Sequence, residues 1–336
     1  MIYSSSYVYS EFKYGTPYKF FMQQSIFFIL GSILMYVFSR TDYKVYYKHA
    51  NTFLGFCFFL LIFVLIPGIG CVRNGSRSWF SILGLGFQPS ELLKLSLIIF
   101  TSKYLCNNDH LKRNVFKFLF PIIMVLFIFF FLILLEPDFG TGMVIVCSII
   151  GLIIISGCDF KIFIRLGFLG VIGIVILILI APYRLSRITS FINPWSDPLG
   201  SGFQMIQSMY AIGPGGILGF GFLNSRQKHF YLPEPQTDFI FSIIAEEFGF
   251  IGCIFLISIF VILYSLLINK AIKVNDLFGK YLVFGLSFLL IFQTLLNLSV
   301  VVGLVPITGV TLPFISYGGS SLFVSMISIG IILNIN

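Results

Sequence analysis

The feature that most constrains this chain is a series of nine apolar segments, each long enough to cross a lipid bilayer. A spanning helix needs about 20 mainly apolar residues. Only 10% of the 336 residues are charged, whereas a soluble domain has about 25%. The segments are 19–39, 51–67, 89–106, 116–135, 139–157, 162–181, 238–268, 279–303 and 314–334. The sequence therefore predicts an all-α polytopic integral membrane protein with one domain, 1–336, and excludes soluble enzymes, disordered proteins and nucleic-acid binders.

Basic residues are concentrated in alternate loops between these segments. One set of loops holds twelve Lys and Arg residues against four Asp residues, and the rest of the chain carries both signs equally. Cytoplasmic loops carry the excess of Lys and Arg in membrane proteins, so we expect this set to face the cytoplasm. The C-terminus then lies in the cytoplasm, and residues 1–18 lie outside. The longest connection, 182–237, also lies outside.

The 182–237 connection mixes aromatic residues with cations and glycines. Connections of this length are usually functional or linkers, and the aromatic content argues against a linker. We predict a large extracytoplasmic loop folded onto the membrane surface, with a short helix near 203–212. Cations that we place on the outer side are Arg73, Arg77, Arg184, Arg187, Arg226 and Lys228. Together they suit an anionic substrate such as a lipid phosphate or pyrophosphate, although each alone can snorkel toward lipid headgroups.

Carboxylates lie at or near the outer ends of several predicted spans. Asp238 directly precedes an apolar run, where it is either a helix N-cap or a functional carboxylate. Glu246 and Glu247 lie two turns deeper, and a carboxylate at membrane depth is by default a functional hypothesis because it is costly. Glu91 opens another helix and lies one turn before Lys94, so the two can form an ion pair in a partly dry site.

Other chemistry is excluded by missing motifs. The chain has no Gly-x-x-x-x-Gly-Lys-Ser/Thr loop for ATP and neither the Ser-Asp-Asn nor the Lys-Thr-Gly motif of penicillin-type transpeptidases. Its six cysteines include no Cys-x-x-Cys pair, so we predict neither disulfides nor a metal site. The sequence implies no cofactor and leaves divalent-cation dependence open. The residues alone predict a membrane protein that acts on an anionic lipid-linked molecule outside.

Several strings resemble the SEDS family of shape, elongation, division and sporulation proteins (FtsW, RodA and SpoVE). They include Pro-Gly-Ile-Gly (67–70), Asn-Gly-Ser-Arg-Ser-Trp (74–79), Gln-Pro-Ser-Glu-Leu-Leu-Lys (88–94), Glu-Pro-Asp-Phe-Gly-Thr-Gly (136–142), Asn-Pro-Trp-Ser-Asp-Pro-Leu (193–199), Tyr-Leu-Pro-Glu-Pro-Gln-Thr-Asp-Phe (231–239) and Leu-Pro-Phe-Ile-Ser-Tyr-Gly-Gly (312–319). They cover nearly the whole chain in order and are most similar to the FtsW and SpoVE branch of spore-forming, Gram-positive bacteria. The family has ten spanning helices, so we expect its first helix to be missing here. Ser78 stands where the family often has Arg.

The resemblance implies a peptidoglycan glycosyltransferase that works at the outer face of the cell membrane during division or sporulation. Its substrate would be lipid II, the undecaprenyl-pyrophosphate-linked disaccharide peptide, polymerised with inversion into β-1,4-linked glycan. Implied partners are a class B penicillin-binding transpeptidase and other divisome or sporulation membrane proteins. One alternative is a lipid II flippase, and another is a scaffold that only recruits the transpeptidase.

The resemblance also implies roles for individual residues. Asp238 would be the catalytic base. We expect substrate binding by Glu91, Lys94, Arg77, Arg187, Gln207, Glu234 and Thr237. Glu91 and Lys94 would line the substrate cavity, and Arg187 and Arg77 would contact the pyrophosphate. A flippase needs polar groups through the membrane midplane, whereas most intramembrane polar residues here lie toward the outer ends, which favours the polymerase.

Overall fold

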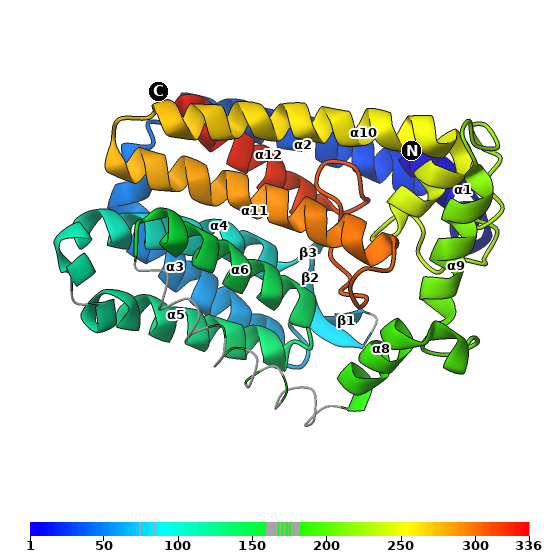
Figure 1. Cartoon of the computed structure of the whole chain (residues 1–336), viewed down its shortest axis with the longest axis horizontal. Helices are drawn as coiled ribbons and strands as arrows, with labels where there is room; N and C mark the ends of the chain where they lie inside the picture. The colour runs from blue at the N-terminus through cyan, green and yellow to red at the C-terminus, as the bar shows by residue number, and fades with distance from the viewer. Residues whose placement is uncertain are drawn as a thin grey trace. The chain divides into compact units, whose positions relative to one another are not determined.

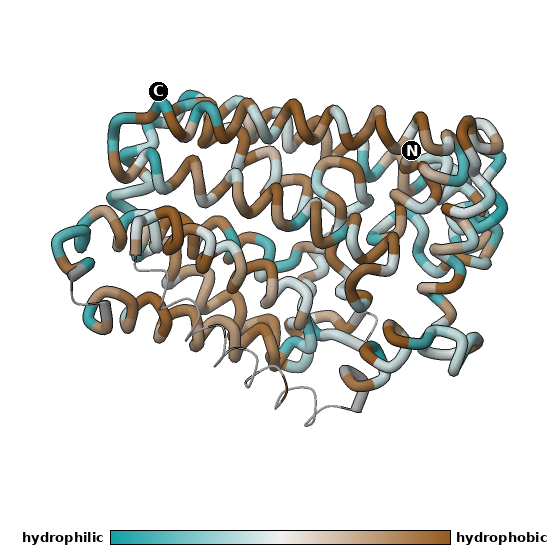
Figure 2. The backbone as a smooth tube through the Cα atoms, in the orientation of Figure 1, coloured by the Kyte–Doolittle hydropathy of each residue, from teal (hydrophilic) through white to brown (hydrophobic). Residues whose placement is uncertain are grey.

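The computed structural model describes residues 1–335 except 74, 83–84, 114, 159–166, 168–169, 171–172, 174 and 176–181. The described part is mainly helical (Figure 1). Five of its helices are long and apolar enough to cross a membrane: α2 (Lys19–Arg40), α3 (Lys44–Leu65), α5 (Val115–Leu135), α10 (Ile240–Lys273) and α11 (Leu277–Val301). Two shorter apolar helices are α6 (Phe139–Ile155) and α12 (Gly319–Asn334). Figure 2 shows hydrophobic residues along these helices and hydrophilic residues gathered in loops.

Eight of the nine predicted spans coincide with helices of the structure, counting α4 (Pro89–Asn107) with those above. The ninth, 162–181, lies mainly outside the described residues. Helix α3 begins at Lys44 rather than at 51, because exposed Lys44 and Lys48 occupy its first turns and extend the helix beyond its apolar part. The segment predicted at 238–268 forms α10, which is interrupted at Gly249.

The chain divides into two compact units. The first unit consists of Met1–Ser25, Asp159–Ile262 and Gln293–Tyr317, and the second of Ile26–Cys158, Leu263–Phe292 and Gly318–Asn336. Helices α2, α10 and α11 each contribute residues to both units. The single-domain organisation stays a prediction.

Helix α4 forms the core of the second unit. It contacts α3, α6 and α12, and its buried residues lie on all sides, including Leu93, Leu95 and Ile98. A small antiparallel sheet precedes it, with strands β1 (Cys71–Arg73), β2 (Ser76–Ile82) and β3 (Leu85–Phe87) in that order. These strands were not predicted from the sequence, because they are short and polar residues interrupt their apolar alternation.

The first unit contains the loop that joins the spans on the predicted outer side. The loop contains α8 (Pro182–Ile192), η2 (Pro194–Ser196), α9 (Phe203–Ile212) and η3 (Gly213–Gly215). The N-terminal helix α1 (Ile2–Tyr14) belongs to the same unit. Helix α9 confirms the short helix predicted near 203–212. Four serines of α1 are buried: Ser4, Ser5, Ser6 and Ser10. Small hydroxyl side chains allow close packing, so α1 is part of this unit's core.

Helix α10 is broken at Gly249, whose φ of 61° and ψ of −158° are not helical. Two helix carbonyls at the break, of Glu246 and Glu247, accept hydrogen bonds from the amides of Phe220 and Gly221, both at 2.9 Å. On the other side, Phe250 N donates to Gly216 O (2.9 Å), and Ile251 N donates to Ile217 O (3.2 Å). Residues 216–221 therefore supply the hydrogen bonds that α10 loses at its break.

Candidate active site

Asp238 lies at the end of a turn, 234–238, that leads into α10. Thr237 N donates to Glu234 O at 3.1 Å and closes the turn. Thr237 Oγ1 lies 2.8 Å from Glu234 O and 3.0 Å from Asp238 Oδ1, so its single hydrogen is shared between them. The structure thus brings together three residues that the sequence analysis selected.

The backbone of this turn is held by α11 and by residues 310–317. Asn297 Nδ2 on α11 donates to Asp238 O (2.8 Å) and to Val310 O (2.7 Å). Tyr317 N donates to Gln236 O (2.8 Å), and Ser316 Oγ donates to Thr237 O. Asn297 is only 1% exposed. Asn297 was not among the predicted site residues, although an Asn within an apolar run is an intramembrane polar residue and could have been selected on that ground.

Asp238 has the electrostatics of a weak base that is ionised at neutral pH. Its side chain is half-buried, and this burial raises the pKa of the carboxyl to about 6, with a smaller increase from Glu234. The Thr237 hydrogen bond and the Arg187 charge act in the opposite direction on this pKa. Arg187 is an exposed residue of α8 whose Nη1 donates to Ile307 O at 3.0 Å. Arg187 therefore belongs to the electrostatic surroundings of Asp238.

The Asp238 side chain does not cap α10. Within the described part of the chain, the side-chain hydrogen bond to its carboxylate comes from Thr237 and not from the first turn of α10. An N-cap carboxylate would accept from a backbone amide two or three residues later. The carboxylate is therefore available for another role.

Helix α9 is attached to the helix that follows Asp238. Ser208 Oγ lies 2.9 Å from Ser242 Oγ on α10 and donates to Val301 O at 2.8 Å. Gln207, on the same helix, is half-buried. Gln207 was predicted to bind substrate, whereas Ser208 was not predicted, because a buried serine has no distinctive pattern in sequence.

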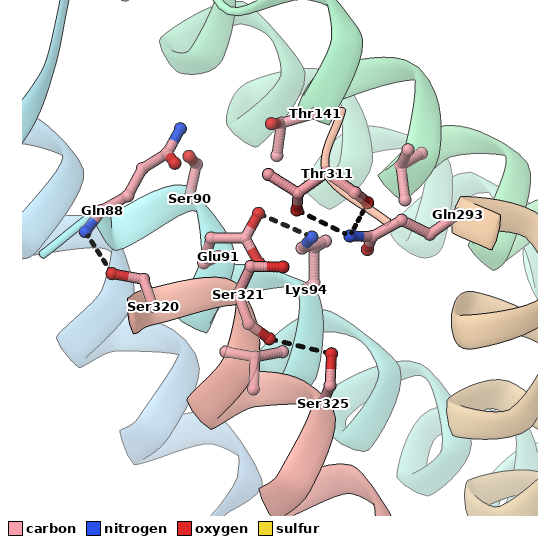
Figure 3. Close-up of polar contacts among 12 residues, drawn as sticks. Gln88, Ser90, Glu91, Lys94, Thr141, Gln293, Thr311, Ser320, Ser321 and Ser325 are labelled. Atoms are coloured by element: carbon pink, nitrogen blue, oxygen red, sulfur yellow. Dashed lines mark hydrogen bonds and ion pairs between the residues drawn. The ribbon is translucent and has the colours of Figure 1, made fainter. Parts of the chain in front are cut away.

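In the second unit, Glu91 and Lys94 form the predicted ion pair. Lys94 Nζ lies 2.8 Å from Glu91 Oε1, and the two side chains are 2% and 8% exposed for Lys94 and Glu91, respectively. Figure 3 shows this pair near the start of α4. Glu91 Oε2 is buried and has no hydrogen-bond partner among the described residues. The pair is confirmed and is more deeply buried than expected, and its contact with substrate stays a prediction.

Gln88 connects three helix N-termini of this unit. Its Nε2 donates to Asp138 Oδ2 at 2.8 Å. Its backbone N donates to Ser320 Oγ at 3.0 Å, as Figure 3 shows. Asp138 caps α6 through Thr141 N (3.2 Å). Because α4, α6 and α12 begin at these residues, their positive dipole ends lie close together.

Glu136 is a buried carboxyl in the turn between α5 and α6. It is 0% exposed, and neither carboxyl oxygen has a hydrogen-bond partner within the described ranges. Burial, with a smaller contribution from nearby Asp138, raises its pKa to about 9. Glu136 is therefore neutral at pH 7.

Lys228 is not an outward-facing cation, contrary to expectation. Its Nζ lies 2.8 Å from Glu247 Oε1, and both side chains are 0% exposed. The same carboxylate oxygen accepts from Ser4 Oγ and from Ser225 N. The charge of Lys228 is compensated by Glu247, so it does not contribute to an anionic substrate site.

Glu246 and Glu247 both have structural contacts, and the functional role expected of them stays a prediction. Glu246 accepts hydrogen bonds from Arg226 N (2.8 Å) and from Ser225 Oγ. Together with the Glu247–Lys228 pair, these contacts attach residues 225–228 to α10. A carboxylate within an apolar run is costly unless it is paired, and here the partners come from a loop distant in sequence.

Arg77 is also placed differently from a free surface cation. It is half-buried on β2, and its Nη1 donates to Leu65 O at the end of α3 (3.4 Å). A cation at a helix C-terminus is favourable. The contact of Arg77 with a pyrophosphate stays a prediction. The side chains of Arg73 and Arg184 lie outside the described residues.

No group of three or more His, Cys, Asp or Glu side chains is arranged to hold a metal ion in the part of the chain that the structure describes. The expectation that the protein needs no cofactor stays a prediction.

The whole chain, residues 1–336, matches the family model FTSW_RODA_SPOVE, described as cell cycle protein. It is 44% identical to stage V sporulation protein E of Bacillus subtilis (strain 168), covering 100% of this chain and 92% of that protein. It is 40% identical to the "Probable peptidoglycan glycosyltransferase FtsW" of Geobacter sp. (strain M18), with the same coverage.

Two solved structures are similar over most of their length. One, described as structural coordination of polymerization and crosslinking by a peptidoglycan synthase complex, has a TM-score of 0.78 and 31% identity over 94% of this chain and 88% of that one. The Rod shape determining protein RodA of Thermus thermophilus has a TM-score of 0.70 and 26% identity over 99% and 92%. These similarities and the helices described above confirm the predicted all-α polytopic membrane fold.

Proposed function

This chain belongs to the FtsW, RodA and SpoVE family of cell cycle proteins and is a multi-pass membrane peptidoglycan glycosyltransferase, and we propose that it polymerises lipid II with Asp238 as the general base. The observation that carries this assignment is the Asp238 turn. The Asp238 carboxylate is half-buried and has a pKa of about 6. Hydrogen bonds to the backbone of the turn hold the residue in place, so its carboxylate oxygens stay available for the reaction.

The reaction requires a base because a sugar 4-hydroxyl is a poor nucleophile. Its oxygen attacks C1 of a second sugar, and the bond from C1 to the lipid pyrophosphate breaks with its electron pair on the leaving group. An α-linked donor that gives a β-linked product is inverted in one displacement, so no covalent intermediate forms. The hydroxyl proton passes to the Asp238 carboxylate. Positioned proton transfer contributes roughly 10²–10⁴-fold to the rate.

Two neighbours of Asp238 support this role. The Thr237 hydroxyl, 3.0 Å from Oδ1, can orient the carboxylate while leaving Oδ2 for the substrate. The positive charge of Arg187 favours the ionised form of Asp238 and suits a contact with the departing pyrophosphate. Thr237, Glu234 and Gln207 belong to the same unit and are proposed to bind the substrate around the base.

The distribution of basic loops supports an active site outside the cytoplasmic membrane and a C-terminus in the cytoplasm. We also place a class B penicillin-binding transpeptidase, with other divisome or sporulation membrane proteins, as the partner of this chain. The similarity to a peptidoglycan synthase complex supports that placement.

The test compares purified parent protein with Asp238→Asn on fluorescent lipid II. Asn has nearly the same shape but cannot take the proton, so we expect glycan formation to fall at least about 100-fold. Thermal unfolding should be unchanged, since the turn is held by backbone contacts. Asp197→Asn is the matched control, because Asp197 is an exposed acid of the same loop whose contacts are to Gly200 and Ser201. It should keep activity.

Near-normal glycan formation by Asp238→Asn would reject Asp238 as the base. Movement of lipid II across vesicle membranes by the parent protein, without any glycan, would instead support the flippase alternative. Crosslinking by a partner that needs the chain but not Asp238 would support the scaffold.

A further inference from the structure

The first unit contains a cavity separate from the Asp238 turn. It has a volume of about 670 Å³ and lies between α1 and residues 223–231. Small-molecule sites have volumes of roughly 300–1,000 Å³. Residues that provide polar or aromatic groups to its wall are Tyr7, Asn224, Arg226, Gln227, His229 and Tyr231. The cavity is therefore large enough for several residues of a peptide.

The cavity wall favours an anionic ligand that also donates hydrogen bonds. Arg226 is exposed, and its guanidinium lies over the Phe220 ring at 5.0 Å, which fixes the plane of its donor groups. Gln227 Oε1 is buried and has no hydrogen-bond partner among the described residues. The lining residues include no carboxylate. The wall thus offers a planar cation, and beside it an unused acceptor that a ligand reaches when the half-buried Gln227 side chain rotates.

Residues of α10 hold the wall of the cavity in place. Glu246 accepts from the Arg226 backbone amide at 2.8 Å, and the buried Lys228–Glu247 pair anchors the next turn of chain. The Lys228 ammonium lies 4.9 Å from the centre of the Tyr7 ring, and the Tyr7 and His229 rings meet edge to face. The buried ion pair and the Glu246 contact thus hold the backbone of this wall in place before any ligand binds.

We propose that this cavity binds the peptide portion of the lipid-linked disaccharide substrate, with Arg226 contacting a peptide carboxylate and Gln227 Oε1 accepting from a peptide N–H. This inference rests on the proposed function. The peptide is the part of such a substrate that carries both carboxylates and amide N–H groups. The same stretch of chain continues from the cavity at Tyr231 into the Asp238 turn, so a substrate that reaches the base has its peptide in the same unit.

A lipid pyrophosphate fits this wall less well. It has no N–H donor for Gln227 and carries more charge than one guanidinium compensates. Arg187, which acts on Asp238, is the better cation for the pyrophosphate. The peptide therefore explains both polar groups of the wall.

The experiment measures polymerisation by Arg226→Gln with two substrates: lipid II with its free-acid peptide and the same lipid-linked disaccharide without peptide. A charge-assisted hydrogen bond has a net contribution that corresponds to about ten- to a hundredfold in affinity. We expect KM for the peptide-bearing substrate to rise by about that factor with little change in kcat, and KM for the peptide-free substrate to stay unchanged. Arg226→Lys should give an intermediate KM, because it keeps the charge and loses the planar fork.

Arg40→Gln is the matched control, since Arg40 is also exposed and lies over an aromatic ring, that of Tyr36 at 5.4 Å. It should leave both KM values unchanged. An equal rise of KM on both substrates, or no rise on either, would overturn the proposal. An effect that appears only when a transpeptidase is present would also overturn it and assign the surface to that partner.

Direct binding separates this inference from the proposed function. A soluble muramyl pentapeptide should bind the purified parent protein and should bind Arg226→Gln about tenfold or more weakly. Absence of glycan from the parent on either substrate would reject the proposed function, whereas failure of the pentapeptide to bind would reject the peptide site alone.

Discussion

Loss of Lys228 should destabilise the protein far more than loss of a surface lysine. Lys228 and Glu247 are both 0% exposed and lie 2.8 Å apart. In Lys228→Met, the Glu247 carboxylate would remain buried with only Ser4 and Ser225 as donors. Removing one partner of a buried pair costs about 3–5 kcal/mol. The same reasoning applies to Glu247→Gln, which leaves a buried ammonium.

The double variant Lys228→Met with Glu247→Gln should recover much of this loss. It leaves no unpaired charge, and replacing a whole buried pair is often close to neutral. One kcal/mol shifts Tm by roughly 2–4 °C for chains of 150–250 residues, so each single variant should lower the apparent Tm in detergent by about 6–20 °C. The double variant should lie closer to the parent than either single variant does.

The Lys112–Asp109 pair provides the control for this comparison. These side chains are 28% and 46% exposed, and exposed pairs contribute about 0–1 kcal/mol. Lys112→Met should therefore lower the apparent Tm by only a few degrees. If the losses of Lys228 and Glu247 simply added in the double variant, the two charges would not be coupled, and the reasoning would be refuted.

Other predictions concern the site itself. The rate should fall as pH decreases through about 6, the pKa of Asp238, because the protonated carboxyl cannot accept a proton; a pH–rate profile that is flat from 5 to 8 would contradict this. Lys94→Ala should reduce activity and apparent Tm more than loss of exposed Lys48, and equal effects of the two changes would argue against a role for the buried pair. Arg187→Ala should lower turnover by roughly 10²–10³ with normal membrane insertion, and an unchanged glycan yield at limiting lipid II would exclude this contact. Glu136→Gln should keep the parent Tm at pH 7, because a carboxyl whose pKa is about 9 is already neutral there; a large loss of stability would show that Glu136 is ionised.

Local patterns predicted the spans and the short-range contacts. Apolar length located eight helices, and a spacing of three residues predicted the Glu91–Lys94 pair, since both depend on neighbours in sequence. The Thr237–Asp238 contact lies within a single turn. In each of these features the interacting residues lie close together in the sequence.

Features that depend on distant partners could not be predicted. Lys228 is a loop cation in sequence, and only folding brings it to Glu247 and Ser4. Asn297 is 59 residues from Asp238, whose carbonyl it binds. Burial of polar groups is set by tertiary packing, which no local pattern contains.

The break in α10 makes chain length, rather than residue type, the critical property of residues 216–221. This segment contacts α10 through backbone N–H and C=O groups at both ends, so most of its side chains do not decide the fit. Gly219 is an exception, since an added Cβ would lie 2.3 Å from Glu247 O. A single inserted or deleted residue would shift every backbone pair at once and leave buried polar groups unpaired, at about 1–3 kcal/mol each. A surface loop, where insertions are normally tolerated, here has the fixed spacing of a helix interior.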